Sequence, residues 1–534
     1  KRLIYKYKPI YHFMKRLIYE ELVDWKNDAN HKPLILDGVR QCGKTYLLKQ
    51  FGSKEFKNCV YCNFEESPEL NELFDSNMEP SKIIRDIELL KSVRIVAGDT
   101  LLIMDEIQEC EPAITSLKYF HEHMPELHVA CAGSLLGIMK SKASFPVGKI
   151  DTKHMFPMNF CEYLMAEGEK SLAEFIQSDP DPDEISKPVH ETLLRLTRDY
   201  CIVGGMPEIV QTWISHHDIN KVDSLQKELL QNYERDFAKH GGNMVEMLTS
   251  IWTSLPSFLS RENRKFIFKD LKKDGRSEDF RDPVQWLTNA HLIYKVNHIK
   301  RHAYPPSTEQ DDTQYKLYMC DIGLLRAMAG HPAGVMITEN DDTHLYKGGM
   351  YENLTVCELM SAGAENLYYW KDGKYEVDLI SAIDGKSVPI EVKSGTNFSM
   401  ESLNRYQNKY GITWGVVVSK SVPKRTDSRA LIPFYLVENI QRKKTAHTND
   451  DYINTSGMPY EFMFNKDDWI EDKDGFELII PMKKHHRGST PKCSIQRKKG
   501  NAWSDIVAAI SVKDNGDVII SANKRFDGRA MIRL

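Results

Sequence analysis

The chain has 534 residues, of which 41% are hydrophobic and 28% are charged, and its formal net charge is -5 at pH 7. This composition excludes a mainly disordered or fibrous protein and allows three or four domains that each bury a core. No apolar run reaches the roughly 18 residues of a membrane helix, so no membrane partner is expected. Ten scattered cysteines favour reduced thiols in the cytoplasm, and the small net charge leaves nucleic-acid binding to local patches.

The first part of the chain contains a phosphate-binding motif. Residues 1–24 are interpreted as an extension and a first helix, and a P-loop ATPase domain is predicted over 25–222. Within it, residues 34–45, LILDGVRQCGKT, join an apolar strand to the pattern G-x-x-x-x-G-K-T, and a helical sequence follows. A strand, this loop and a helix are what nucleotide binding requires.

Each residue of this loop has a physical role in binding ATP and Mg²⁺, the two expected cofactors. Gly38 and Gly43 let the loop curl so that backbone N–H groups point at phosphate oxygens. Lys44 reaches the β- and γ-phosphates, and the Thr45 hydroxyl binds Mg²⁺. The other predicted nucleotide contacts are Arg40, Gln41, Cys42 and Tyr46.

A second motif supplies acidic groups for hydrolysis. LLIMDE, residues 101–106, reads as a strand that is buried on both faces and ends in two acids. Asp105 is expected to hold Mg²⁺ through water, and Glu106 to orient the attacking water as a catalytic residue. Ser134, at the end of another strand, is placed to sense the γ-phosphate. Runs at 59–66 and 128–136 complete a parallel α/β sheet.

Five motifs occur in a fixed order along the chain: GVRQCGKT (38–45), LLIMDEIQ (101–108), Ala-Gly-Ser (132–134), FPVGKIDTKHMFPMNFCEYL (145–164) and VGGMP (203–207). As a set they resemble a prokaryotic AAA-type (AAA+/STAND-like) ATPase family, whose C-terminal domain of unknown function is related to PD-(D/E)XK restriction-endonuclease folds. The resemblance covers roughly residues 15–440. It implies an ATPase joined to a nuclease-like domain.

The chain departs from this family at one position. The family usually has Gly-Arg where this chain has Gly148 and Lys149, and Lys lacks the bidentate fork of Arg. Arg235 and Arg261 are the other cations considered for the role of an arginine finger.

The middle segment, 223–300, is predicted to be helical. Apolar spacing indicates helices at 245–260, 264–271 and 281–296, the last leading into a strand. Three helices and a strand pair would form a winged-helix module, which can bind DNA or act as a spacer. The third helix carries few basic residues, so the spacer interpretation is preferred.

The next segment, 301–440, has the element order of a PD-(D/E)XK nuclease fold. A helix is expected at 350–363, followed by three strands, a helix and a further strand. Asp384-Gly385 between two alternating runs predicts a hairpin. A two-residue loop there places Asp378 opposite Glu391 and Glu376 opposite Lys393, unless a bulge at Pro389 shifts the register.

Opposed carboxylates need a cation, and Mg²⁺ suits their oxygens. Asp378, Glu391 and the Val392 carbonyl are expected to bind this metal, with Glu352 completing the acidic cluster. Glu391 and Lys393 then act in catalysis, Lys393 by orienting or deprotonating water beside a phosphate. The alternative is a set of solvated strand charges with an ordinary Glu376–Lys393 ion pair.

The tail is predicted as a linker, 441–450, and a small all-β domain, 451–534. Residues 481–534 hold 12 Lys and Arg against 4 Asp and Glu. With Trp503 and Phe526 this excess suits a nucleic-acid surface, although a basic solvated face gives the same pattern.

The function predicted from these features is a Mg²⁺-dependent ATPase whose nucleotide state controls nucleic-acid binding or cleavage by the attached nuclease-like domain. DNA is preferred over RNA as the partner, and a homo-oligomer is compatible with the sequence. The alternative is a nucleotide-dependent switch or scaffold that binds a protein or DNA without cleavage. A chaperone-like remodeller is the third interpretation.

Overall fold

The computed structural model describes residues 14–75, 78–133, 145–261, 264–273, 275–331, 344–395, 398–441, 460–472, 475–480, 492–499, 502–506, 508–513 and 517–533. The chain divides into two compact units, of which the second holds residues 443–534 together with 403–417 and 424–431. No helix among the described residues is long and apolar enough to cross a membrane. The predicted linker, 441–450, lies almost wholly outside the described residues.

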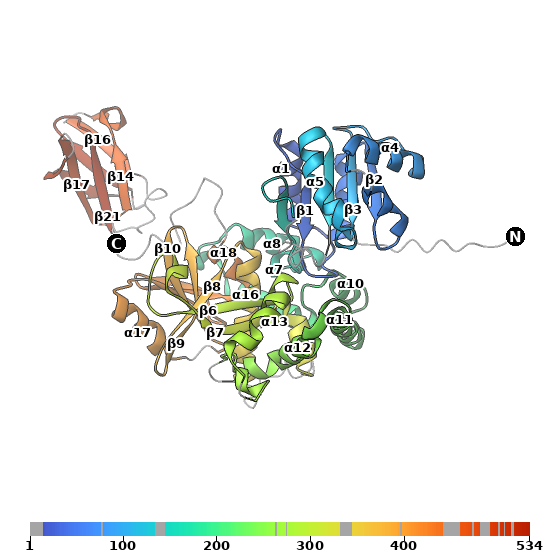
Figure 1. Cartoon of the computed structure of the whole chain (residues 1–534). Coiled ribbons are helices and arrows are strands. Elements are labelled where there is room, and N and C mark those ends of the chain that lie inside the picture. Colours follow the sequence, from blue (N-terminus) through green and yellow to red (C-terminus); the bar gives the residue numbers. More distant parts are fainter. Residues whose placement is uncertain are drawn as a thin grey trace. The chain divides into compact units, whose positions relative to one another are not determined.

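The N-terminal part contains a five-stranded parallel sheet in the order β2-β3-β4-β1-β5 (Figure 1). Its strands are β1 Leu34–Asp37, β2 Asn58–Asn63, β3 Thr100–Asp105, β4 His128–Ala132 and β5 Asp151–His154. All six positions of β3 are buried, as the apolar run in the sequence predicts. The prediction of a parallel α/β sheet is confirmed.

Helices cover both faces of this sheet. Helix α2 packs against β2, β3 and β4, and a large apolar core joins α4 and α5 to the other face. The helices are α1 Ile18–Asn27, α2 Lys44–Glu55, α3 Glu72–Asp75, α4 Pro80–Lys91 and α5 Glu111–His123. The predicted boundary between residues 24 and 25 falls inside α1, because no break interrupts this helix.

A helical region follows the sheet. Its helices are α7 Phe160–Ala166, α8 Lys170–Gln177, α9 Lys187–Val203, α10 Pro207–His216 and α11 Ile219–His240. The predicted boundary between residues 222 and 223 falls inside α11. The helix continues through this position without a break.

The middle segment differs from the predicted winged helix. Helices α12 Val245–Leu259 and α13 Ser277–Asn289 form, but the predicted helix at 264–271 is replaced by a 3-10 turn, Phe268–Asp270. The reason is local: Arg264 has a positive φ of 44°, and the Phe266 N–H donates to the carbonyl of Tyr315 in a neighbouring strand at 3.1 Å. The third helix also ends at Asn289 rather than 296.

The strand after α13 belongs to a larger sheet of eight strands, in the order β12-β13-β11-β10-β9-β8-β6-β7. Strand β6 Ile293–Ile299, which ends just before the boundary expected at 300, pairs with both β7 and β8. The other strands are β7 Gln310–Met319, β8 Leu367–Asp372, β9 Tyr375–Ile383, β10 Lys386–Val392, β11 Gly415–Ser419, β12 Lys424–Thr426 and β13 Arg429–Pro433. The accompanying helices are α14 Ile322–Met328, α16 His344–Ser361, α17 Glu401–Tyr410 and α18 Val437–Gln441.

The hairpin β9–β10 has the predicted register. Asp384 and Gly385 both have positive φ, 44° and 77°, which is the conformation of a two-residue type I′ turn. Lys386 pairs with Ile383, and the pairing continues without a shift through Pro389, which lies opposite Ile380. The bulge considered at Pro389 does not form.

The C-terminal tail forms two four-stranded sheets, β14-β21-β17-β18 and β15-β16-β20-β19, as expected for a small β-domain. The strands are β14 Tyr460–Phe464, β15 Ile470–Asp472, β16 Gly475–Ile480, β17 Lys492–Lys499, β18 Ala502–Ile506, β19 Ala509–Val512, β20 Val518–Ala522 and β21 Gly528–Arg533. Phe526 packs in the core with Phe464 and Trp469, so its expected role on a nucleic-acid surface is wrong. The side chain of Trp503 lies outside the described part.

Candidate nucleotide site and nuclease-like cluster

The phosphate-binding loop connects β1 to α2 through two glycines that no other residue could replace without strain. Gly38 has a φ of 144°, and a Cβ there would lie 2.2 Å from the carbonyl oxygen of Met155. Gly43 has a φ of 98°, in the region that favours glycine. The Lys44 Nζ donates to the carbonyls of Gly38 and Val39, each at 2.8 Å, which holds the ammonium inside the loop.

The end of β3 brings the predicted acids to this loop. The Thr45 hydroxyl donates to the Asp105 carboxylate at 2.9 Å, and the Tyr61 hydroxyl donates to the same carboxylate at 2.7 Å. Glu106, with a positive φ of 50°, accepts a hydrogen bond from Gln108 at 2.5 Å. Burial raises the pKa of Glu106. Tyr61 was missed because a tyrosine in a strand carries no motif.

The remaining loop residues point in several directions. Arg40 forms an ion pair with Asp236 of α11, while the Cys42 thiol lies in the core against the Met155 carbonyl, at 3.4 Å. Tyr46 is about half exposed, at 47%, and Gln41 has a positive φ of 65°. The predicted sensor, Ser134, lies outside the described residues.

The three candidates for an arginine finger are engaged elsewhere in the chain. Lys149 pairs with Glu122 at 3.1 Å, Arg261 pairs with Asp270, and Arg235 donates to Asn232 at 3.0 Å. Arg40 is the arginine that the fold places in the loop itself.

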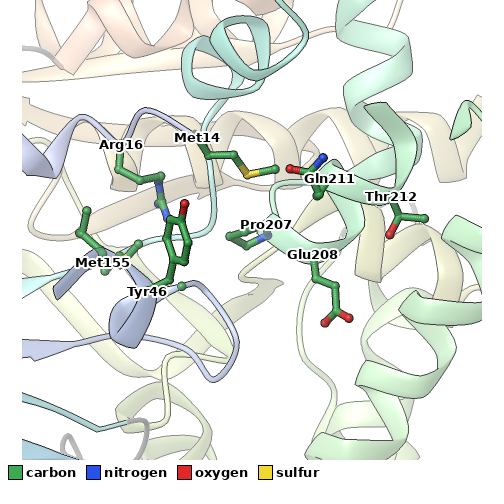
Figure 2. A pocket seen from close by; sticks show the side chains of 10 residues that line it. Met14, Arg16, Tyr46, Met155, Pro207, Glu208, Gln211 and Thr212 are labelled. Carbon is green, nitrogen blue, oxygen red and sulfur yellow. The ribbon is translucent and has the colours of Figure 1, made fainter. Parts of the chain in front are cut away.

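A cavity of about 310 Å³ opens beside the loop (Figure 2). Its wall shares Gly43, Tyr46 and Leu47 with the loop and the start of α2, and Arg16 fixes one side through hydrogen bonds to the carbonyls of Cys42 and Phe156 at 2.9 and 2.6 Å. The other lining residues are Met14, Met155, Pro207, Glu208, Gln211 and Thr212.

The sequence motif VGGMP positions the far wall of this cavity. A Cβ at Gly205 would lie 2.0 Å from the Met158 carbonyl oxygen, and one at Gly204 would lie 2.3 Å from the Asp321 carboxylate. These two glycines therefore allow the chain to pass close to its neighbours before Pro207 begins α10. The motif was recognised in the sequence, but its contribution to a pocket depends on a fold that brings residues 14–16 and 207–212 together.

The second predicted site is a buried cluster on the hairpin. The Asp378 carboxylate accepts a hydrogen bond from the Val392 N–H at 2.8 Å, and the Lys393 Nζ lies 2.6 Å from Glu391. Glu352, from α16, lies in the same cluster and accepts a hydrogen bond from the Tyr318 hydroxyl at 2.8 Å. The structure thus brings Asp378, Glu391 and Glu352 into one cluster. Glu376, which was expected opposite Lys393, forms ion pairs with Lys316 and Lys371.

Two cations that the sequence did not indicate lie among these acids. Arg264 pairs with Glu352 and lies 3.9 Å from Asp378. Lys316 has no exposed side-chain surface and lies 2.7 Å from Glu376 and 3.7 Å from Glu352. Arg264 lies in a segment that was predicted as a helix, so the sequence did not place it near the hairpin. Lys316 lies in the apolar run YKLYM, and a lysine in such a run indicates a buried charge that needs an acidic partner.

These cations balance the cluster electrostatically. Burial raises the pKa of Glu391 and of Glu352. Burial opposes ionisation of Asp378 as well, but Lys316, Lys393 and Arg264 hold its pKa below the usual range. In this arrangement Arg264, Lys316 and Lys393 compensate the carboxylate charges that a bound metal ion would otherwise compensate.

Comparison with known proteins supports the first site. Residues 30–164 match a family model described as an AAA domain, whereas residues 194–334 and 347–436 match two domains of unknown function, DUF8612 and DUF4143. An uncharacterized protein of Methanocaldococcus jannaschii, MJ1544, is 26% identical over 360 residues, which are 66% of this chain and 72% of that protein.

Two solved structures match the chain with TM-scores below 0.5. The Walker-type ATPase PABY2304 of Pyrococcus abyssi has a TM-score of 0.38 at 12% identity, covering 59% of this chain and 96% of that one. AMPPCP-bound DnaA from Aquifex aeolicus has a TM-score of 0.26 at 14% identity, covering 52% and 87%.

The AAA-domain match and the loop geometry together support an AAA-type, P-loop ATPase-like domain. The match over 347–436 names no activity, so the PD-(D/E)XK assignment stays a prediction.

Proposed function

We propose that this chain is a Mg²⁺-dependent ATP hydrolase. The observation that carries the proposal is the hydrogen bond between Thr45 and Asp105, at 2.9 Å, next to the buried Lys44. The Thr45 and Asp105 oxygens can bind Mg²⁺, and the Lys44 ammonium can bind phosphate. All three lie at the carboxyl end of parallel strands, where α/β folds bind Mg²⁺ and a triphosphate. Glu106, the residue after Asp105, then orients the attacking water.

The cavity beside the loop accommodates the base and ribose of the nucleotide. Its wall is largely apolar, with Met155, Leu47 and Pro207, which suits the faces of an aromatic ring. Because Gly43 belongs to both the cavity wall and the loop, and Tyr46 lies in the first turn of α2, one nucleotide can span both.

Two variants test this proposal through ATP hydrolysis and nucleotide binding. Lys44→Ala is expected to lose both, with hydrolysis slowed by at least about 100-fold, because it removes the main cation for the phosphates. Glu106→Gln is expected to keep ATP binding but to slow hydrolysis by about 100-fold or more, because the amide cannot accept a proton from water.

The matched control is Glu109→Gln, which removes an exposed carboxylate from the 3-10 turn that follows Glu106. Unchanged hydrolysis in Lys44→Ala or Glu106→Gln would contradict the proposal.

The nuclease-like cluster carries a second proposal, in which the nucleotide state gates nucleic-acid binding or cleavage, with DNA as the preferred partner. The supporting observation is the juxtaposition of Asp378, Glu391 and Lys393 on the hairpin. Arg264 competes with metal for these acids, so Mg²⁺ binds only after this guanidinium has moved away from Glu352 and Asp378.

Metal-induced stabilisation tests this competition. Arg264→Ala is expected to lose about 3–5 kcal/mol of stability, because it breaks a buried ion pair with Glu352 and leaves Lys316, at 3.7 Å, as the cation nearest to this carboxylate, and Mg²⁺ or Mn²⁺ should restore part of it. The measurement is the free energy of unfolding with and without metal. Arg261→Ala, which breaks a more exposed ion pair three residues away, is the control and should not gain metal dependence.

Cleavage itself is tested with supercoiled plasmid and single-stranded DNA, in Mg²⁺ or Mn²⁺, with and without ATP. Metal-dependent cutting that disappears in Lys393→Ala and changes in Glu106→Gln supports a gated nuclease. Absence of cutting on any substrate, with ATP hydrolysis intact, assigns the chain to the nucleotide-dependent switch or scaffold class.

A further inference from the structure

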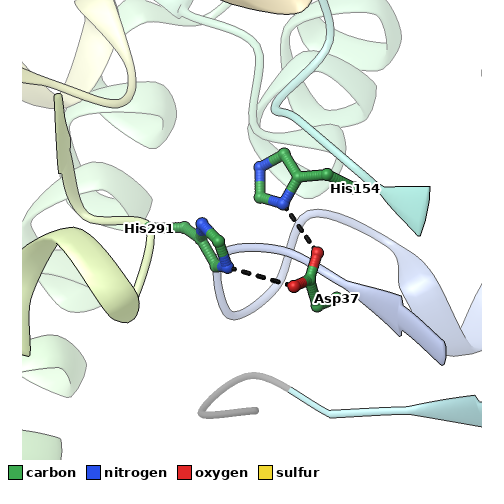
Figure 3. A group of neighbouring side chains, drawn as sticks. All are labelled: Asp37, His154 and His291. Atoms are coloured by element: carbon green, nitrogen blue, oxygen red, sulfur yellow. Dashed lines mark hydrogen bonds and ion pairs between the residues drawn. The ribbon is translucent and has the colours of Figure 1, made fainter. Parts of the chain in front are cut away.

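Three potential metal ligands meet at one end of the parallel sheet, outside both sites described above (Figure 3). Asp37 is the last residue of β1, and His154 is the last residue of β5. These two residues are directly paired in the register of the sheet. His291 comes from the turn between α13 and β6, where its positive φ of 59° turns the chain toward them.

Their side chains converge on a small volume. The His154 Nδ1 lies 2.8 Å from one oxygen of Asp37, and the His291 Nε2 lies 3.5 Å from the other. One ligand atom from each residue lies within 4.8 Å of the other two. The two imidazole rings are 4.1 Å apart between centroids. In a tetrahedral zinc site with bonds of about 2.0–2.1 Å, ligand atoms are about 3.3 Å apart, so small side-chain rotations convert this cluster into a coordination shell.

We propose that Asp37, His154 and His291 bind a divalent transition-metal ion of the zinc class. Two imidazoles and one carboxylate suit Zn²⁺, Co²⁺ or Ni²⁺, whereas Mg²⁺ prefers an all-oxygen shell. The site is therefore chemically distinct from the Mg²⁺ position at Thr45. Asp37 is buried, but both histidine side chains keep about a quarter of their surface exposed, at 24% and 23%, which leaves an open side for a fourth ligand such as water.

The position of the site gives the metal a consequence for the nucleotide loop. Asp37 immediately precedes Gly38, the first residue of the phosphate-binding motif, while His291 lies two residues before β6 of the eight-stranded sheet. A bound ion cross-links these two segments, which are far apart in the sequence. Nucleotide affinity should then differ between the metal-free and metal-loaded protein.

Metal binding to the full-length chain tests the proposal directly. The protein is stripped with a chelator, transferred to chelator-free buffer without Mg²⁺ or nucleotide, and titrated with Co²⁺ and with Zn²⁺ by calorimetry and visible absorption. We expect one ion per chain with the absorption of tetrahedral Co²⁺ and without the near-ultraviolet thiolate band that the chain's ten cysteines would produce if they were the ligands.

Three single variants identify the ligands. His154→Ala, His291→Ala and Asp37→Asn should each weaken binding at least tenfold, whereas His123→Ala, which removes an exposed imidazole at the end of α5, should not. Circular dichroism checks each fold, and His291→Gln serves as the milder substitution in the turn if an alanine variant does not fold. Absence of stoichiometric Co²⁺ binding, or equal affinity in wild type and His291→Gln, would overturn the proposal and leave the cluster as an ion pair between Asp37 and two histidines.

Discussion

The carboxyl groups of this chain differ in their burial and in the hydrogen-bond donors around them. Asp105 accepts hydrogen bonds from the hydroxyls of Thr45 and Tyr61, whereas Glu358, on α16, is buried and accepts one from the Phe160 N–H at 3.1 Å. Burial raises the pKa of Glu358 to about 8, and the nearby Glu438 adds to the effect. A carboxyl group that is neutral in the folded protein at neutral pH makes stability depend on pH.

The sign of this dependence follows from the two pKa values. The unfolded chain releases the Glu358 proton as pH rises past about 4.5, but the folded protein keeps it until about 8. The folded state therefore binds more protons in this window, and its stability falls as pH rises from about 5 to 8. Glu358→Gln, which stays neutral, is expected to match wild type near pH 5 and to be more stable by about 1–3 kcal/mol near pH 8.

Urea unfolding of both proteins across this range measures the difference. The control is Glu401→Gln, which removes an exposed acid at the start of α17. We expect it to leave the pH dependence of the free energy of unfolding unchanged. Parallel pH profiles for wild type and Glu358→Gln would show that Glu358 is ionised in the fold.

Among the elements, the hairpin β9–β10 and the phosphate-binding loop were predictable because their information is local. Asp384-Gly385 fixes a two-residue turn, and the turn fixes every pairing along two strands. The phosphate-binding loop is likewise recognised from glycine, lysine and threonine at fixed spacing within eight residues. Arg264 and Lys316 could not be found in this way, because they reach the cluster through pairing of β7 and a turn that interrupts a helical pattern.

The turn of this hairpin gives a prediction at the same scale. Gly385 has a φ of 77°, and a Cβ added there would meet no atom within 4 Å, so a substitution changes only backbone strain. Gly385→Ala is expected to cost about 1 kcal/mol of stability, and Gly385→Asn less, because asparagine tolerates the left-handed region. Lys386→Ala, at the next exposed position, is the control in urea unfolding. Equal stability of the alanine and glycine proteins would mean that the turn is not type I′.

For the whole molecule, the sequence did not indicate which helices and strands connect the segments on either side of the expected domain boundaries. Helices α1 and α11 continue through the expected boundaries at 24 and 222. Strand β6 ends just before the expected boundary at 300 and pairs with β7 and β8, which follow it in the chain. Composition and motif spacing do not report such contacts, because they depend on which segments pack together. The cavity beside the phosphate-binding loop also could not be predicted from the sequence, because its walls include the N-terminal segment and α10, which are far apart in the chain.

The tail is the exception, because its apolar core is formed within its own sequence. Among the described residues of the tail, the ten that form this buried core lie between Phe464 and Ile532, while the residues proposed for ATP hydrolysis belong to the first compact unit. A chain that ends at residue 450 is therefore expected to hydrolyse ATP within about twofold of the full-length rate, because it loses no group of the nucleotide site. If the basic tail contributes to nucleic-acid binding, the same truncation should weaken DNA binding and reduce its dependence on salt. ATPase rates and DNA binding at two salt concentrations, measured on both chains, separate these contributions. A large loss of hydrolysis would show that the tail supports the nucleotide site after all.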